Sequence, residues 1–230
     1  MNKKVQIPGP GAYNQKLYIP EVYNHILGVN NIKMASLTEN ESRAIDFLIR
    51  NFSQEYNINQ LSRELKLSPR GIFKILKKLE KQNYLISKKQ GNNLFYQINY
   101  ESEEALDVCK FALSERKLAP FIRVQINDLM ELRKLTKIAI LFGSALTKGA
   151  EAKDVDVVLV FNKKEFSKVE KAMDEINLIK HKKIHAIYQT EEDFADNARK
   201  RDKVILSAIK TGIFLWGRDS FLEAIKNGKD

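Results

Sequence analysis

Apolar positions near the start of the chain recur at the spacing of short amphipathic helices. The segment Thr38-Glu39-Asn40-Glu41 is a capping box, in which the Thr38 and Glu41 side chains each accept a hydrogen bond from the other residue's backbone amide. It predicts a helix whose inward face carries Ala44, Ile45, Leu48 and Ile49. We expect a second helix over about 58–66. A third follows Ser68-Pro69, which supplies an N-cap and a proline at the first helical position.

Two short extended runs follow these helices. The runs YLISKK and LFYQIN flank Gln90-Gly91-Asn92-Asn93 and predict a β-hairpin. Three helices and a hairpin in this order resemble the winged helix-turn-helix family over roughly residues 36–100, and LSRELKLSPRGIFKILKKLEKQNYL is the most characteristic stretch. The resemblance implies that the helix from Ser68 is a recognition helix and that the hairpin over 84–98 is the wing.

Positive side chains gather on the expected recognition helix and wing. Most of them recur at three- and four-residue steps, on the helix face opposite Ile72, Leu76 and Leu79. A helix N-terminus and a line of lysines can contact phosphates at a major groove, so we expect binding to double-stranded DNA. The alternative is a winged helix that binds protein and whose basic face is only solvated. The expected DNA contacts are Ser68, Arg70, Lys74, Lys77, Lys78, Lys88 and Lys89.

Two other segments lack chemistry of their own. Residues 1–35 mix prolines, glycines and tyrosines without a period, and we expect an irregular arm that packs on another surface, such as a partner subunit. Residues 101–135 predict two helical stretches separated by Pro120, which we interpret as a connector that also covers the next domain and offers a surface for a homodimer. Cys109 lies in this connector and is expected to be a small buried apolar residue.

The most informative stretch is KIAILFGSALTKGAEAKDVDVVLVF, residues 137–161. Two apolar runs, 138–142 and 155–161, predict strands buried on both faces. Asp154 and Asp156 stand two residues apart, so they project from the same face and repel each other unless a cation neutralises them. Carboxylate oxygens suit Mg²⁺ or Mn²⁺. Gly143-Ser144 ends the first strand, where its backbone can approach a phosphate closely.

Gly143-Ser144, nine intervening residues and Asp154-Val155-Asp156 resemble the motif of the nucleotidyltransferase superfamily of the DNA polymerase beta type, and within it the minimal nucleotidyltransferases. The resemblance extends over about 125–230. It implies that Gly143 and Ser144 bind the triphosphate of a nucleoside triphosphate, with ATP as the first choice, and that Asp154 and Asp156 are catalytic and hold the metal ions. An acceptor hydroxyl would attack the α-phosphorus and release pyrophosphate.

One position departs from the pattern of this family. The family usually carries a third carboxylate on a later strand, where it completes a metal site and helps to activate the attacking hydroxyl. The expected strand here is 183–188, and it holds His185 in place of the acid. His185 is either a metal ligand or proton acceptor, or a partly buried histidine with ordinary partners. Lys148 is either a phosphate contact or solvated. Arg218, after Trp216-Gly217, either faces a phosphate or is exposed, and we expect it to be exposed.

Composition narrows the class of protein. The chain has 230 residues, 43% of them hydrophobic and 30% charged, as in globular proteins. Residues 1–100 hold 15 Lys and Arg against 7 Asp and Glu, whereas residues 101–230 hold 24 against 22, so most of the net charge of +10 lies in the half with the expected winged helix. One cysteine, no apolar run long enough for a membrane span and no secretory signal favour a cytoplasmic protein without a membrane partner.

These observations predict an α/β (α+β) protein with four segments: an arm (1–35), a winged helix-turn-helix domain (36–100), a helical connector (101–135) and a nucleotidyltransferase-like domain with a mixed sheet flanked by helices (136–230). One hypothesis is a metal-dependent nucleotidyltransferase whose acceptor is a protein such as a toxin partner, a small molecule or a nucleic-acid end. The other is a transcription regulator whose domain senses a nucleotide without turning it over. His185 keeps both open.

Overall fold

The computed structural model describes residues 37–114 and 118–227. The predicted irregular arm, 1–35, lies outside the described residues. In the parts of the chain that the structure describes, the helices are too short or too polar to cross a bilayer.

The N-terminal part has the expected helices and hairpin. Thr38 and Glu41 form the predicted capping box, and the Ser68 hydroxyl accepts a hydrogen bond from the backbone N–H of Gly71. A two-residue strand that the periodicity could not predict pairs Tyr56 with Tyr96, so the sheet has three strands in the order β1-β3-β2. In chain order the elements are α2 (Glu39–Arg50), β1 (Tyr56–Asn57), α3 (Ile58–Leu65), α4 (Pro69–Lys81), β2 (Leu85–Gln90) and β3 (Asn93–Ile98).

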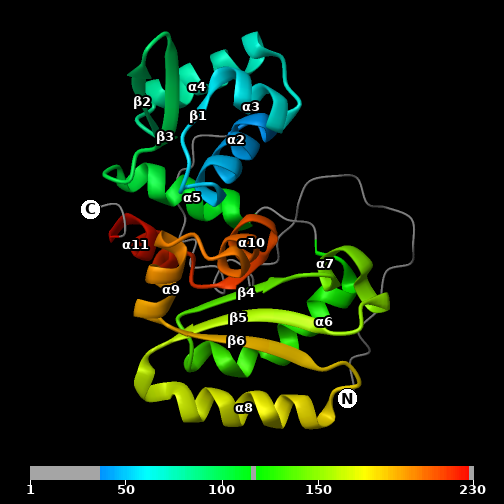
Figure 1. The fold of residues 1–230 in the computed structure, drawn as a ribbon. Coiled ribbons are helices and arrows are strands. Elements are labelled where there is room, and N and C mark those ends of the chain that lie inside the picture. The colour runs from blue at the N-terminus through cyan, green and yellow to red at the C-terminus, as the bar shows by residue number, and fades with distance from the viewer. Residues whose placement is uncertain (1–36, 115–117, 228–230) are drawn as a thin grey trace, which may run out of the picture. The chain divides into compact units, whose positions relative to one another are not determined.

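The rest of the chain forms a four-stranded mixed sheet with helices (Figure 1). The strand order is β6-β5-β4-β7, in which β5 and β6 are parallel and the other pairs are antiparallel. The strands are β4 (Ile138–Phe142), β5 (Val155–Phe161), β6 (Ile184–Thr190) and β7 (Ile213–Trp216). The helices are α5 (Glu103–Ser114), α6 (Pro120–Leu129), α7 (Ala145–Lys148), α8 (Phe166–Ile179), α9 (Glu191–Arg199), α10 (Lys203–Thr211) and α11 (Arg218–Asn227).

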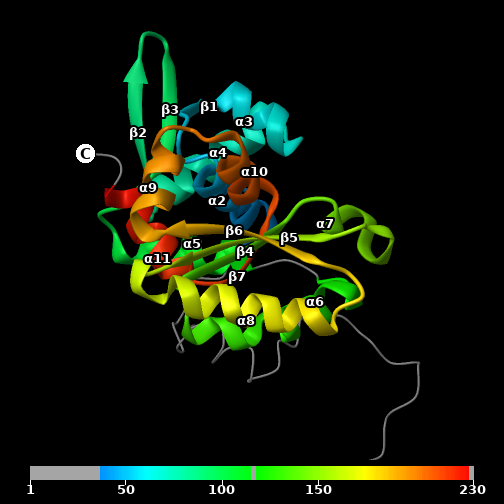
Figure 2. The same cartoon turned by 60° about the horizontal axis from the view of Figure 1, so that its bottom comes forward.

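Both faces of this sheet are covered, which explains the nearly continuous apolar runs of β4 and β5. Leu141, Val157 and Leu159 pack with α6 and α8 on one face. Ile140 and Val158 pack on the other face, in a core shared with α5, α10, α11 and the helices of the winged helix. Figures 1 and 2 show α8 along one side of the strands and α10 and α11 on the other. The chain therefore has a mixed α/β architecture with a winged-helix part and a helix-covered sheet.

Buried arginines hold the α10–β7 turn. Arg50 of α2 is only 2% exposed and donates hydrogen bonds from Nη1 to the carbonyls of Ile209 (2.7 Å) and Gly212 (2.9 Å). The expectation of an exposed Arg218 is wrong, because this side chain is buried and donates to the carbonyl of Phe214. Burial, with repulsion from Arg50, lowers the pKa of Arg218 to about 10. Tertiary packing decides this burial, and a local sequence pattern does not report it.

Candidate functional site

The turn after β4 brings the backbone against a carboxylate. Gly143 has φ of +78°, a conformation that glycine adopts without strain. A Cβ at position 143 would lie 2.2 Å from Oδ2 of Asp156, so a side chain there would displace the carboxylate. Ser144 follows and is half-buried, and its side chain makes no capping bond to the four-residue helix α7. The hydroxyl is thus not used as a helix cap.

Asp154 and Asp156 converge as their two-residue spacing predicts. Asp154 immediately precedes β5, and Asp156 is the second residue of that strand. Asp156 pairs with Phe142 of β4 on one side and with His185 of β6 on the other. The register therefore places both acids between the end of β4 and the start of β6, beside Gly143.

His185 occupies the position on the neighbouring strand from which a third side chain reaches the pair. One ligand atom from each of Asp154, Asp156 and His185 lies within 4.8 Å of the others. Nδ1 of His185 lies 3.5 Å from Oδ2 of Asp154. The His185 side chain is 62% exposed, so it is not a buried core histidine. As expected, β6 from Ile184 to Thr190 contains no Asp or Glu.

The electrostatic environment of the two acids is uncompensated. Burial, with repulsion from Asp154, raises the pKa of Asp156, and His185 opposes this only in part. Among the described lysines and arginines, none forms an ion pair with either carboxylate. Two carboxylates held together at a cost suit a divalent cation, and the donor set of two carboxylates and an imidazole fits one.

Sequence reasoning missed one residue near the site. Lys182, in the loop before β6, donates to the carbonyls of Ala150 and Ala152 and lies 5.6 Å from the centre of the Phe121 ring. These contacts fix the loop that leads into Asp154. The sequence gives no signal for this role, because Lys182 is one of several neighbouring lysines and nothing in their spacing distinguishes it from a solvated side chain. Lys148, left open above, is exposed.

Two of the basic residues expected to contact DNA are already paired within the winged helix. Lys78 forms an ion pair with the buried Glu41 (2.8 Å), and Lys77 forms one with Glu80 (2.7 Å). Ser68 is exposed, but its hydroxyl caps α4. The remaining four are exposed and form no ion pair with any acid of the described ranges: Arg70, Lys74, Lys88 and Lys89.

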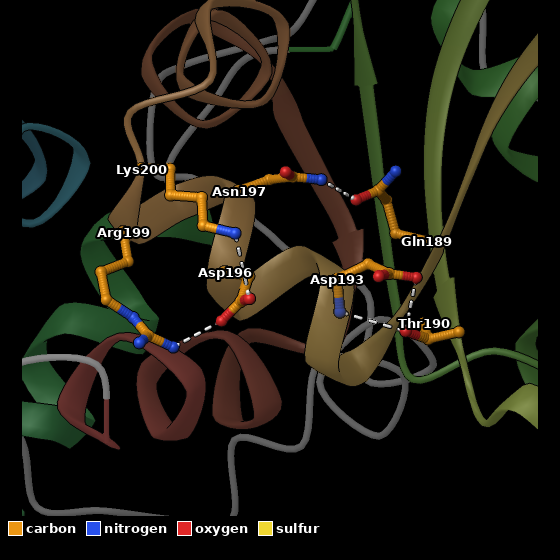
Figure 3. A network of polar contacts seen from close by, with 7 residues as sticks. All are labelled: Gln189, Thr190, Asp193, Asp196, Asn197, Arg199 and Lys200. Atoms are coloured by element: carbon orange, nitrogen blue, oxygen red, sulfur yellow. Dashed lines mark hydrogen bonds and ion pairs between the residues drawn. The ribbon is translucent and has the colours of Figure 1, made fainter.

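A second group of acids lies just past the other end of β6, on α9 (Figure 3). Asp196 accepts from Arg199 (2.5 Å) and Lys200 (3.4 Å), and Asp193 accepts from the Thr190 hydroxyl (2.7 Å). A cavity of about 570 Å³ adjoins this group and is lined by residues of α9, α11 and the sheet. Its lining includes none of the residues expected at the nucleotide site, so cavity and acid pair are separate features.

Comparisons with known proteins agree with this geometry in the C-terminal part. The family model described as "Polymerase beta, Nucleotidyltransferase" matches residues 124–220, a range that contains Gly143, Asp154, Asp156 and His185. A search of the curated proteins gives no match.

Solved structures similar to this chain include two bacterial proteins, ZitR and AdcR. A variant of ZitR from Lactococcus lactis is 18% identical with a TM-score of 0.31, and covers 50% of this chain and 81% of its own. Wild-type ZitR in complex with DNA is 17% identical with a TM-score of 0.29, covering 52% and 98%. The adhesin competence repressor AdcR from Streptococcus pyogenes is 17% identical with a TM-score of 0.31, covering 67% and 88%.

The winged-helix assignment rests on the order of the elements α2 to β3 themselves. For the C-terminal part, the family match and the convergence of Asp154 and Asp156 beside Gly143 agree independently. Residues 124–220 therefore form a nucleotidyltransferase domain of the polymerase beta family, carried on the same chain as a winged helix.

Proposed function

We propose that the protein transfers a nucleoside monophosphate from a nucleoside triphosphate to a hydroxyl acceptor, with Mg²⁺ or Mn²⁺ as the cofactor. The observation that carries this proposal is the uncompensated pair Asp154 and Asp156, which meets the side-chain-free backbone of Gly143 within the range of the family match. Two carboxylates that repel each other in the free protein are stabilised when a cation binds between them, so cation binding offsets a repulsion that no protein cation neutralises.

Each residue of the site has a part in this proposal. Asp154 and Asp156 would hold the divalent cation, with His185 beside them. The cation would neutralise negative charge on the phosphates and stabilise the attacking and leaving oxygens. The absence of a side chain at Gly143 admits the Asp156 carboxylate. The Gly143 backbone would approach the triphosphate, and the Ser144 hydroxyl, which is not used as a cap, would donate to a phosphate oxygen.

The reaction forms one bond and breaks one. The acceptor oxygen bonds to the α-phosphorus, and the bond from that phosphorus to the bridging oxygen of the β-phosphate breaks, so pyrophosphate leaves with the bonding electrons. The hydroxyl proton passes to a carboxylate oxygen of the pair or to water. The acceptor is a protein hydroxyl such as that of a toxin partner, a small molecule, or a nucleic-acid end.

The winged helix would bring the transferase domain to DNA. We propose that it binds double-stranded DNA through phosphates, with Arg70 and Lys74 on α4 and Lys88 and Lys89 on the wing as the main contacts. Four phosphate contacts correspond to a salt slope of about −3.6 in a plot of log affinity against log salt concentration. Replacing Lys88 and Lys89 by alanine should reduce that slope by about 2, whereas Lys77→Ala should change it little because Lys77 is paired with Glu80.

A second function follows from His185. A neutral imidazole does not replace the charge of a carboxylate between cations, so the domain could bind a nucleotide without turning it over and regulate DNA binding by the winged helix. This reading predicts that saturating nucleotide changes DNA affinity, and by linkage that DNA changes nucleotide affinity by the same factor.

One set of experiments tests both functions. The full chain is incubated with labelled ATP, CTP, GTP or UTP, Mg²⁺ or Mn²⁺ and each class of acceptor, and nucleotide binding is measured in parallel. Transfer that is lost in Asp156→Asn and kept in Asp196→Asn supports the enzyme. Nucleotide binding without transfer, together with a shift in DNA affinity, supports the sensor. If the wild type binds no nucleotide with either ion, both proposals fail.

A further inference from the structure

We propose that His185 is a metal ligand and that its imidazole moves the preference of the site away from Mg²⁺ and toward ions that accept nitrogen, such as Mn²⁺ and Co²⁺. This inference rests on the proposed function, because it concerns the ion held by Asp154 and Asp156. It adds the identity of the ion, which the two carboxylates alone leave open.

Strand register is the first support. β5 and β6 are parallel, and Asp156 is paired directly with His185. Side chains of paired residues leave a sheet on the same face, so the imidazole and the Asp156 carboxylate project together. Asp154 lies two residues before Asp156 and shares that face.

Distances are the second support. The three donor atoms lie within 4.8 Å of one another, and two ligands of one ion at about 2.1 Å each are separated by about 3–4 Å. Small rotations of three side chains that are all at least partly exposed would close the remaining gap. The 3.5 Å separation of His185 Nδ1 from Asp154 Oδ2 is already in the range of two ligands of one ion.

The surroundings of His185 give it no other structural task. Its side chain is mostly exposed, while its neighbour Ile184 is buried and anchors the strand. Among the described residues, Asp154 is its only polar partner. An exposed histidine beside two repelling acids is therefore best explained as part of their ion site.

Ligand chemistry sets the direction of the preference. Mg²⁺ requires oxygen ligands and depends on the negative charge around it, whereas imidazole suits transition metals. With histidine as the third group, the site has two negative charges and one nitrogen donor. A carboxylate there would give three charges and only oxygen donors, which would favour Mg²⁺.

The test compares ions and variants in the full chain. Dissociation constants for Mg²⁺ and Mn²⁺ are measured by calorimetry and by competition for the wild type, His185→Asp, His185→Ala and His181→Asp, after thermal melts show that each variant folds. His181 is the matched control, because it is an exposed histidine in the loop before β6 that is not part of the three-residue cluster. We expect the Mg²⁺-to-Mn²⁺ ratio of dissociation constants to fall about 10-fold in His185→Asp and to stay unchanged in His181→Asp.

A spectroscopic measurement reports the bond directly. Pulsed electron paramagnetic resonance of Mn²⁺ bound to the nucleotide-free protein should show coupling to a nitrogen that changes its frequency when the histidines are labelled with ¹⁵N. The coupling should be lost in His185→Ala and kept in His181→Asp. Binding of ion and nucleotide without a histidine coupling overturns this inference and leaves the proposed function standing. Absence of any ion binding overturns both.

Discussion

Two pairs of acids at the two ends of β6 have opposite surroundings. The edge pair, Asp154 and Asp156, has no described lysine or arginine within ion-pair distance, and burial together with mutual repulsion raises the pKa of Asp156. The α9 pair, Asp193 and Asp196, is bound by a threonine hydroxyl, an arginine and a lysine (Figure 3). Both pairs look alike as sequence, since each is a short acidic cluster next to a strand.

The difference shows that the hydrogen bonds and ion pairs of an acidic residue indicate its role better than its presence in an acidic cluster does. The α9 pair belongs to the first turns of a helix and to local ion pairs, which account for its charge without any ligand. Among the described residues, no lysine or arginine neutralises the charge of the edge pair in this way. The residue that faces Asp156 at position 143 is a glycine, which has no side chain. Electrostatic cost that the fold does not offset is typical of functional sites.

The largest expected effect is on ligand binding. Asp154→Asn or Asp156→Asn should weaken binding of a Mn²⁺–nucleotide complex by about 100-fold or more, because each removes a charged ligand of the ion. Asp193→Asn and Asp196→Asn should leave it within about 2-fold. Titration of a fluorescent ATP analogue in the presence of Mn²⁺ measures all four. Equal losses from both pairs would show that general charge, and not the edge pair, governs binding.

The next effect compares two glycines with positive φ. Gly143→Ala should destabilise the protein by about 2–3 kcal/mol, because its Cβ would meet the Asp156 carboxylate in a conformation that is already strained for alanine. Gly149→Ala also has positive φ but meets nothing within 4 Å, so we expect a cost of about 1 kcal/mol. Urea unfolding of the metal-free protein measures both. Equal costs would mean that the alanine Cβ at position 143 does not clash with the Asp156 carboxylate.

A buried but paired acid sharpens the comparison. Burial raises the pKa of Glu41, but Lys78 and Thr38 outweigh it, and the net effect lowers this pKa. An acid with a lowered folded-state pKa stabilises above its unfolded pKa, and this stabilisation is lost as pH falls through the folded value. Glu41→Gln should therefore cost about 1–2 kcal/mol at pH 7, and this cost should fall as the solution is acidified below the ordinary pKa of glutamate and vanish below the lowered pKa of Glu41. A loss that persists in acid would assign it to packing instead.

The smallest effect is on the stability of the metal-free protein, which the same substitution should change in opposite directions at the two pairs. In metal-free protein, Asp156→Asn should raise stability by about 1 kcal/mol, because it removes a charge that burial and Asp154 disfavour. Asp196→Asn should lower stability by about 0.5 kcal/mol, because it weakens exposed ion pairs. Thermal melts in a chelator follow both. Destabilisation by Asp156→Asn would contradict the view that the edge pair is uncompensated.

Local signals in the sequence were enough for most of the fold. The capping box at Thr38, the Ser68-Pro69 helix start and the apolar strands around Gly143 each depend on neighbouring residues, and the structure confirms all of them. The convergence of Asp154 and Asp156 follows from the two-residue period of a strand, which is also local. The strand β1 was missed, because two residues show no period.

Long-range contacts were beyond sequence reasoning. The expected exposure of Arg218 is wrong, because this side chain is buried, donates a hydrogen bond to the carbonyl of Phe214 and lies near Arg50, which is far away in the chain. Lys182 reaches carbonyls of the loop before Asp154, and no spacing reports that contact. The spacing of the basic residues also does not predict the ion pairs of Lys77 and Lys78 within the winged helix, although both are among the expected DNA contacts.

The most direct test of the edge pair as the ion site of the domain is a crystal structure with Mn²⁺ and a non-hydrolysable ATP analogue, with anomalous data at the manganese edge. We predict an anomalous peak about 2.2 Å from carboxylate oxygens of both Asp154 and Asp156, with the triphosphate along Gly143-Ser144. Manganese bound by the nucleotide alone, away from both carboxylates, would contradict the account.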